Sequence, residues 1–240
     1  MTIGRVQTIW RYPVSSLGGE SLDEAELDAT GVVGDRLWGI VDAETGAIAK
    51  PEAEKRWRVT PEVLARLSAS EIEVQIPGGD WMRARSDAAE HALADHFGFP
   101  VKLKRHGPAF ASPDTVEPRY RRSPIHLITS ASLEALKSIL PDSVIDPRRF
   151  RPNLVITLPD DAPGFAEGKW MRREIRIGPV RLYVNEPCDR CAFTMLGQRD
   201  IPFDKAVLPA ISAMNGKSFG IYCAVLEGGR IAAGDPVEVI

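Results

Sequence analysis

The chain has 240 residues, 44% hydrophobic and 26% charged, with a formal net charge of -3. That length allows one large domain or two small ones, and the charge gives no bulk attraction to nucleic acid. There is no run of about 18 apolar residues, and residues 1–14 lack the basic and apolar regions of a signal peptide. We therefore expect a cytoplasmic protein that binds neither nucleic acid nor membranes.

The first half alternates apolar and polar residues more than it follows a helical period. Residues 5–10, 36–42 and 71–76 are predicted strands, and the last places Ile72, Val74 and Ile76 on one face. This half is therefore expected to be rich in β-structure.

Two helices are predicted within that half. Thr60 as N-cap and Pro61 at the first helical position indicate a short helix over 60–67. Residues 87–98 indicate a second, with Asp87 and Glu90 at capping-box spacing and Gly98 as terminator. Residues 107–118 are proline-rich and without periodicity, so we expect them to cross between two halves.

The second half predicts more strands than helices. A strand over 125–128 precedes a helix that Thr129 or Ser130 caps and Pro141 ends. Further strands are expected over 153–158, 219–226 and 236–240, with a hairpin over 173–186 that turns at Gly178 and Pro179. We therefore predict a mainly β (α+β) fold with a few helices, containing a barrel or rolled sheet and no doubly wound nucleotide fold.

The segment "EPCDRCAF" contains Cys188 and Cys191, two of the three cysteines. A structural zinc site would need a second ligand pair, and a redox pair normally opens a helix. Two small buried residues at a strand end are the plain alternative. Arg190 favours a thiolate, which is the donor that a soft metal selects, so one cysteine could be a lone ligand to a metal whose other ligands are organic.

Arginines gather in three further places, although the net charge is slightly negative. Arg36 lies in "GDRLWG", Arg151 and Asn153 stand where "FRPN" enters a strand, and "RYRR" occupies 119–122. Guanidinium groups suit a multiply charged anion, whereas "RYRR" is favoured as a solvated loop. The hydroxyls of Thr129, Ser130 and Ser132 at a helix start could hold an anion or simply cap the helix.

The order of "YPVSSLGGE", "GVVGDRLWGIVD", "HLITSASL", "FRPNLVI", "EPCDRCAFT" and "FGIYCAVLEGGRIAAGDPVEV" resembles the MOSC family, named for the C-terminal domain of molybdenum cofactor sulfurases. The architecture looks like that of the mitochondrial amidoxime-reducing component and its bacterial counterparts. The resemblance covers nearly the whole chain. It implies a smaller N-terminal MOSC-type β-barrel domain over 1–106 and a MOSC domain over 107–240. At family level it also carries a pyridoxal phosphate label.

The resemblance implies molybdenum cofactor (molybdopterin) as the ligand and Cys191 as the catalytic thiolate on the metal. Arg36, Arg151 and Asn153 match positions that hold the pterin and its phosphate, Thr129 matches the hydroxyl residue before the capped helix, and Ser16 matches the serine of Y-P-V-K-S. Ser130, Arg190 and Thr194 complete the predicted cofactor-binding set. Cys188 has no assigned role. Two departures stand out: Ser15 replaces the family's common lysine, and "TMLGQRDIPFD" replaces the usual loop after the cysteines.

The implied activity is reduction of N-oxygenated or other oxo-bearing small molecules by a molybdenum-dependent oxidoreductase. The chain contains no cysteine cluster for an iron-sulfur centre, so electrons are expected from a separate donor protein. Sulfur transfer through a Cys191 persulfide is one alternative. A non-enzymatic carrier of molybdenum cofactor is the other.

Overall fold

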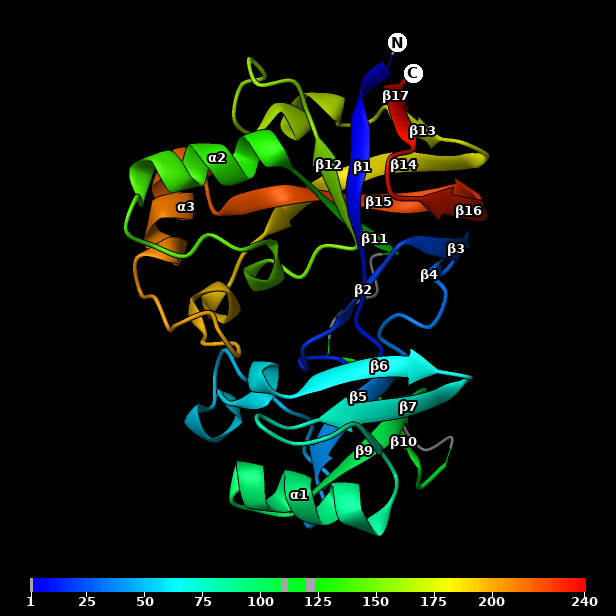
Figure 1. The fold of residues 1–240 in the computed structure, drawn as a ribbon, viewed down its shortest axis with the longest axis vertical. Coiled ribbons are helices and arrows are strands. Elements are labelled where there is room, and N and C mark those ends of the chain that lie inside the picture. Colours follow the sequence, from blue (N-terminus) through cyan, green and yellow to red (C-terminus); the bar gives the residue numbers. More distant parts are fainter. Residues whose placement is uncertain (1, 109–111, 120–123) are drawn as a thin grey trace.

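Seven strands of one sheet close into a barrel in the computed structural model, which describes residues 2–108, 112–119 and 124–240 (Figure 1). The sheet has eight strands in the order β12-β11-β15-β14-β13-β17-β1-β2, and the additional pairing of β12 with β1 closes it. The strands are β1 (Thr2–Arg11), β2 (Glu20–Leu22), β11 (Ile125–Thr129), β12 (Leu154–Thr157), β13 (Glu174–Ile177), β14 (Val180–Asp189), β15 (Ser218–Glu227) and β17 (Pro236–Val239). The predicted mainly β fold with a barrel is confirmed.

Strand β1 completes a barrel whose other strands come from the second half of the chain. It runs antiparallel to both neighbours, with Ile9 opposite Leu154 and Gly4 opposite Val237. The predicted division between 1–106 and 107–240 stays a prediction. Residues 109–111 of the expected crossing segment lie outside the described residues.

The barrel has apolar groups on both sides of β11 and β12. Leu127 and Leu154 join the barrel interior, whereas Ile128 and Val155 pack outward in a cluster with residues of two helices. These helices are α2 (Ser130–Ile139) and α3 (Val207–Asn215). Strands covered on both faces have near-continuous apolar sequences, as "IHLIT" and "LVIT" do.

A second core contains Trp57, Val74 and Leu93 and is formed by residues of the elements drawn in the lower part of Figure 1. Two three-stranded sheets and helix α1 (Asp87–Phe97) surround it, and a third small sheet pairs β16 with β3 from the two halves. Within the described residues, no helix is long and apolar enough to span a membrane. The strands are β3 (Glu24–Asp28), β4 (Gly31–Val32), β5 (Trp38–Asp42), β6 (Leu64–Ser68), β7 (Glu71–Gln75), β8 (Met82–Arg83), β9 (Val101–His106), β10 (Thr115–Val116) and β16 (Gly229–Ala232); the 3-10 helices are η1 (Lys55–Trp57), η2 (Thr60–Glu62), η3 (Pro147–Arg149), η4 (Ala166–Trp170) and η5 (Ala192–Met195).

The prediction of a helix over residues 60–67 is wrong. Only η2 is helical there, and the chain continues as β6, antiparallel to β7 with Ala65 opposite Val74. The Thr60 hydroxyl donates to the Trp57 carbonyl instead of capping a helix. Burial of Ala65 against the second core thus outweighs the local helix signal.

Other boundary signals are confirmed or shifted slightly. Gly98 ends α1 at a φ of 74° and Gly178 turns the hairpin at 55°. The α1 N-cap is Ser86 and not Asp87, since Ser86 Oγ accepts from Ala89 N. Strand β5 begins at Trp38 because Arg36 has a φ of 49°, which no strand residue adopts.

Candidate functional site

Cys191 lies where β14 leaves the barrel. The backbone N–H of Arg190 donates to the Lys217 carbonyl at 2.8 Å, which holds the segment after the strand. Cys191 is then the N-cap residue of η5, and its side chain is exposed, whereas Cys188 is fully buried in β14. The two cysteines of the C-x-x-C segment therefore occupy different environments.

Arg190 contacts Cys188, the cysteine without a predicted role. Arg190 Nη1 donates to Cys188 Sγ at 2.6 Å, and Nη2 donates to the Phe150 carbonyl at 2.7 Å. Burial alone would raise the pKa of the Cys188 thiol, but Arg190 and then His126 and Tyr222 favour the thiolate and bring that pKa to about 6. The neighbours of Cys188 therefore favour the thiolate form of its side chain.

Arg36, Arg151 and Asn153 meet although they are far apart in sequence. Arg36 Nη1 donates to Asn153 Oδ1 at 3.2 Å, and Arg36 Nη2 donates to the Arg151 carbonyl at 2.9 Å. Asn153 is fully buried; its Oδ1 also accepts from His126 N at 3.1 Å, and its Nδ2 donates to the Trp10 carbonyl. The structure therefore brings together the three residues that the D-R-x-W and F-R-P-N segments predicted.

The arginines of this cluster differ in their counter-charges. Arg36 pairs with the buried Asp35 carboxylate, and Arg190 faces the Cys188 sulfur. Arg151 donates Nη1 to the Leu17 carbonyl and stacks over the Tyr12 ring at 4.2 Å from its centroid. Burial, followed by repulsion from Arg36, lowers the pKa of Arg151 to about 9. Arg151 therefore sits where a negative ligand would stabilise its charge most.

Two guanidinium donors in the cluster have no acceptor. Arg151 Nη2 and Arg190 Nε are buried, and neither has a hydrogen-bond partner among the residues that the structure describes. Buried donors are almost always satisfied in folded proteins. Two unpaired donors on neighbouring arginines are the groups that an acceptor-rich anion would satisfy.

Ser16 lies in a turn at the edge of this cluster. Its φ is 73°, and the next residue, Leu17, supplies the carbonyl that accepts from Arg151. Ser15, which stands where the family commonly has lysine, pairs its hydroxyl with His106 Nε2 at 2.9 Å. The turn predicted to be near the cofactor therefore does contact one of the predicted arginines.

Thr129 and Ser130 have other partners. Thr129 Oγ1 caps α2 and donates to the buried Glu167 carboxylate at 2.7 Å, and Ser132 Oγ donates to the same carboxylate. Ser130 Oγ accepts from Leu158 N at 3.0 Å. Of the two alternatives for these hydroxyls, capping is the one seen for Thr129, and the Glu167 carboxylate lies at the start of α2; the roles of Thr129 and Ser130 in cofactor binding stay predictions.

Thr194 supports the turn that carries Cys191. Its hydroxyl donates to the Cys191 carbonyl at 3.1 Å, and its own carbonyl accepts from Arg149. Arg149 is fully buried and also binds the carbonyls of Val144, Leu196 and Pro202.

The segment "RYRR" spans residues 119–122, of which 120–122 lie outside the described residues. The solvated loop expected there stays a prediction.

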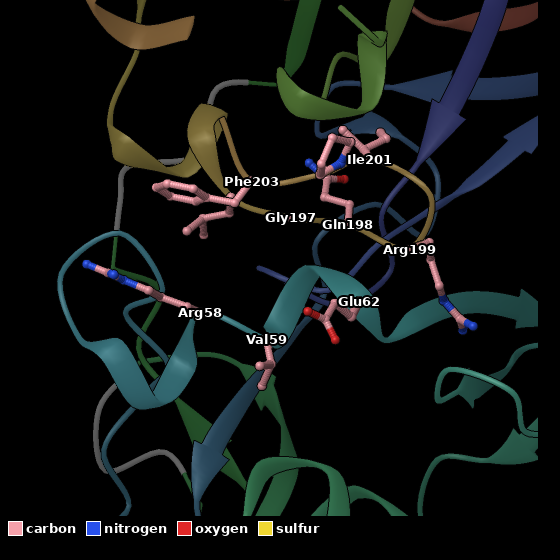
Figure 2. Close-up of a pocket in the computed structure, with 10 residues that line it drawn as sticks. Arg58, Val59, Glu62, Gly197, Gln198, Arg199, Ile201 and Phe203 are labelled. Carbon is pink, nitrogen blue, oxygen red and sulfur yellow. The ribbon is translucent and has the colours of Figure 1, made fainter. Parts of the chain in front are cut away.

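The altered run after the cysteines forms one wall of a pocket. Residues 196–203 face residues 58–62 across a cavity of about 360 Å³, with Gly197, Phe203 and Glu62 around it (Figure 2). The run folds back on itself through a two-way backbone bridge between Gln198 and Ile201, and Arg199 reaches the Gln75 carbonyl at 2.6 Å. The cavity therefore lies between the two halves, one short helix beyond Cys191.

Three residues near the cluster were not among the predicted site residues: His126, Tyr222 and Tyr12. His126 Nε2 lies 3.2 Å from the Phe219 carbonyl, and its ring is 5.4 Å from that of Tyr222 on the neighbouring strand. Burial and the adjacent Cys188 raise the pKa of Tyr222. His126 is the only polar side chain inside the apolar run "PIHLI", which was the available signal for it.

Among the described residues, no group of three or more His, Cys, Asp or Glu side chains is placed to hold a metal ion. The arrangement is a closed barrel with one exposed thiol among the described residues, Cys191, next to a half-buried cluster of three arginines. Within the described residues, this is a β-barrel protein whose one exposed cysteine adjoins an arginine cluster.

The chain belongs to the MOSC family. The MOSC domain model matches residues 94–238 and the MOSC N-terminal beta barrel domain model matches residues 3–102. The mitochondrial amidoxime-reducing component 1 of Mus musculus is 26% identical, with 99% of this chain and 83% of that protein covered. The molybdenum cofactor sulfurase of Drosophila mojavensis is 25% identical over 90% of this chain but only 31% of its own length. The YuaD protein from Bacillus subtilis has the same fold, with a TM-score of 0.52, 13% identity and coverage of 100% and 96% of the two chains.

Proposed function

We propose that this protein binds molybdenum cofactor through Cys191 and reduces N-oxygenated or other oxo-bearing small molecules. The observation that carries the proposal is the pair of orphan donors, Arg151 Nη2 and Arg190 Nε, beside an exposed thiol. The names of the relatives, an amidoxime-reducing component and a molybdenum cofactor sulfurase, support the same class of chemistry.

The residues present fit the chemistry of that cofactor. Its phosphate is a multiply charged acceptor, and within the described part of the chain Arg151 has an unsatisfied N–H and no ion pair with a carboxylate. A thiolate is the donor that soft metals select, and a metal bound by a dithiolene needs only one further soft ligand from the protein. Cys191 would hold the metal, and Arg36, Arg151, Asn153 and Arg190 would hold the pterin and phosphate.

Each protein group then has a definite task. Arg151 and Arg190 bind and orient the anion, while Asn153 fixes Arg36 against the barrel. When bound, the group would supply two-electron transfer at molybdenum, and removal of oxygen from substrate with two electrons and two protons gives water. The electrons would come from a separate donor protein, and the cavity of residues 58–62 and 196–203 is available for part of the small-molecule substrate.

Sulfur transfer is the second candidate, because Cys191 is exposed and one relative is a sulfurase. A persulfide on Cys191 would leave Arg151 without an anion to bind, which makes this candidate weaker. A carrier of the intact cofactor would use the same residues without turnover.

Metal analysis of protein made in a host that synthesises the cofactor separates these candidates. We expect about one molybdenum per chain in the wild type and none in Cys191→Ala, with Cys223→Ala, another cysteine of the barrel, as the control. Metal-free protein with cyanide-labile sulfur on Cys191 would overturn the proposal in favour of sulfur transfer. Bound molybdenum without reduction of any amidoxime or N-oxide by an artificial electron donor would leave the carrier function.

A further inference from the structure

Cys188 is the strongest unexplained feature of the site, because a fully buried cysteine contacts a half-buried guanidinium. Its sulfur accepts from Arg190 Nη1 at 2.6 Å, a short distance for a sulfur acceptor. Cys223, by contrast, is equally buried on β15 within the apolar barrel core, and burial raises its pKa to about 12. The two buried cysteines therefore differ in their neighbours and not in their exposure.

Arg190 needs a partner on that side. Three arginines lie together, and the carboxylate bonded to them is Asp35, which faces Arg36. Arg190 Nη2 has a neutral carbonyl as acceptor, so among the described residues Cys188 is the ionisable group that Arg190 contacts directly. The Nε of Arg190 is buried, and a partly desolvated guanidinium without a counter-charge would be destabilising.

We propose that Cys188 is a positioning residue: its sulfur is the built-in counter-ion of Arg190 and fixes this guanidinium in the anion-binding cluster. Cys191, three positions further on, is the exposed cysteine of the segment. The link to cofactor binding rests on the proposed function, whereas the contact of Cys188 with Arg190 does not.

The groups that face Cys188 come from three elements. Arg190 follows the same strand, His126 is on β11 and Tyr222 is on β15. All three favour the thiolate, and Arg190 does so most strongly. If Arg190 is the main partner, removal of its charge must weaken the thiolate more than any change elsewhere on the protein.

The first test follows thiolate absorbance at ~240 nm in the cofactor-free Cys191→Ala protein between about pH 4.5 and 8. The Cys223 thiol is silent in this window, so a single step near pH 6 belongs to Cys188. We expect Arg190→Met to move the midpoint up by at least about one pH unit, and Arg176→Met, on the exposed surface, to leave it unchanged. An unchanged midpoint in Arg190→Met would overturn the proposal.

Arg190→Lys is the fallback if Arg190→Met does not fold. It keeps the charge but loses the planar fork, so we expect a smaller upward shift in the same direction. A midpoint in Arg190→Lys equal to that of the parent protein would count against a specific contact.

The second test is a double-mutant cycle in thermal unfolding. The loss of Tm caused by Arg190→Lys should be smaller by several degrees in a Cys188→Ser background than in the wild type, because the partner has already been removed. Cys223→Ser, the same change at an equally buried cysteine, should leave the full loss. Equal losses in the two serine backgrounds would show that Cys188 is only a packing residue.

Both tests use protein without cofactor. If molybdenum never binds, they still report on Cys188; if they fail, the metal analysis of Cys191 stands unaffected. The two proposals can therefore fail separately.

Discussion

Replacement of Arg149 is the most informative stability test of the loop that carries Cys191. This guanidinium is fully buried and donates to the carbonyls of Val144, Thr194, Leu196 and Pro202, which belong to both flanks of the site. Arg149→Met keeps most of the side-chain volume but leaves up to four carbonyls without this donor.

The expected magnitude follows from these contacts. Each buried carbonyl that loses its donor costs about 1–3 kcal/mol. Part of that cost is offset because burial lowers the pKa of Arg149, which means that its charge is itself desolvated. We expect a net loss of about 3–5 kcal/mol in the free energy of unfolding, typical of a broken buried network.

Arg148→Met is the matched control at the adjacent position. Arg148 forms ion pairs with Asp146 and Asp200, and the Asp200 side chain is 68% exposed, so we expect about 1 kcal/mol or less. Urea unfolding, monitored by tryptophan fluorescence, gives both free energies. They are compared with the same m value, the slope of unfolding free energy against urea concentration. If Arg149→Met is no more destabilising than Arg148→Met, the assignment of Arg149 as the anchor of the loop is wrong.

Three further predictions concern binding, packing and pH. Arg151→Met should weaken binding of inorganic pyrophosphate to the cofactor-free protein by about 10-fold or more in calorimetry, since it removes an orphan donor; unchanged affinity would refute the anion site. Gly220→Ala should lower Tm more than Gly216→Ala, because both have positive φ but only at Gly220 would a Cβ lie 2.5 Å from the Leu127 carbonyl; equal losses would contradict this. The pKa of Asp42 is lowered to about 2, first by the Thr45 backbone N–H and then by Arg56, so its contribution is complete above the unfolded pKa and is lost as pH falls through about 2. The difference in urea midpoint between wild type and Asp42→Asn should therefore shrink from pH 5 to pH 2, and a constant difference would show that Asp42 does not titrate this way.

The sequence predicted best the ends of helices and hairpins that depend on the conformational preference of a single residue. Gly98, Gly178 and Thr129 mark element ends through their own backbone preferences, and the structure has them in those roles. The helix predicted over 60–67 was wrong because Thr60 and Pro61 give only a local helix signal. The pairing of β6 with β7 and the burial of Ala65 depend on the tertiary structure.

The candidate site divides in the same way. The motifs around Arg36, Arg151 and Asn153 identified residues that do meet. The partner of Arg190 could not be predicted, because in sequence it adjoins Cys191, and only the direction of β14 turns Cys188 inward. Glu167 was invisible as well, since nothing near it in sequence links it to the start of α2.

The closure of the barrel by β1 has a consequence for folding during synthesis. Strand β1 is made first, but its neighbours β12 and β17 are made more than half a chain later. The core around Trp57 and Leu93 can form in the meantime, since its strands and helix come from consecutive segments. Until β12 and β17 have been synthesised, β1 is unpaired except where its end pairs with β2, and unpaired strand edges are templates for pairing with other chains. The newly made protein should therefore depend on chaperones most strongly in the interval between completion of the first core and closure of the barrel.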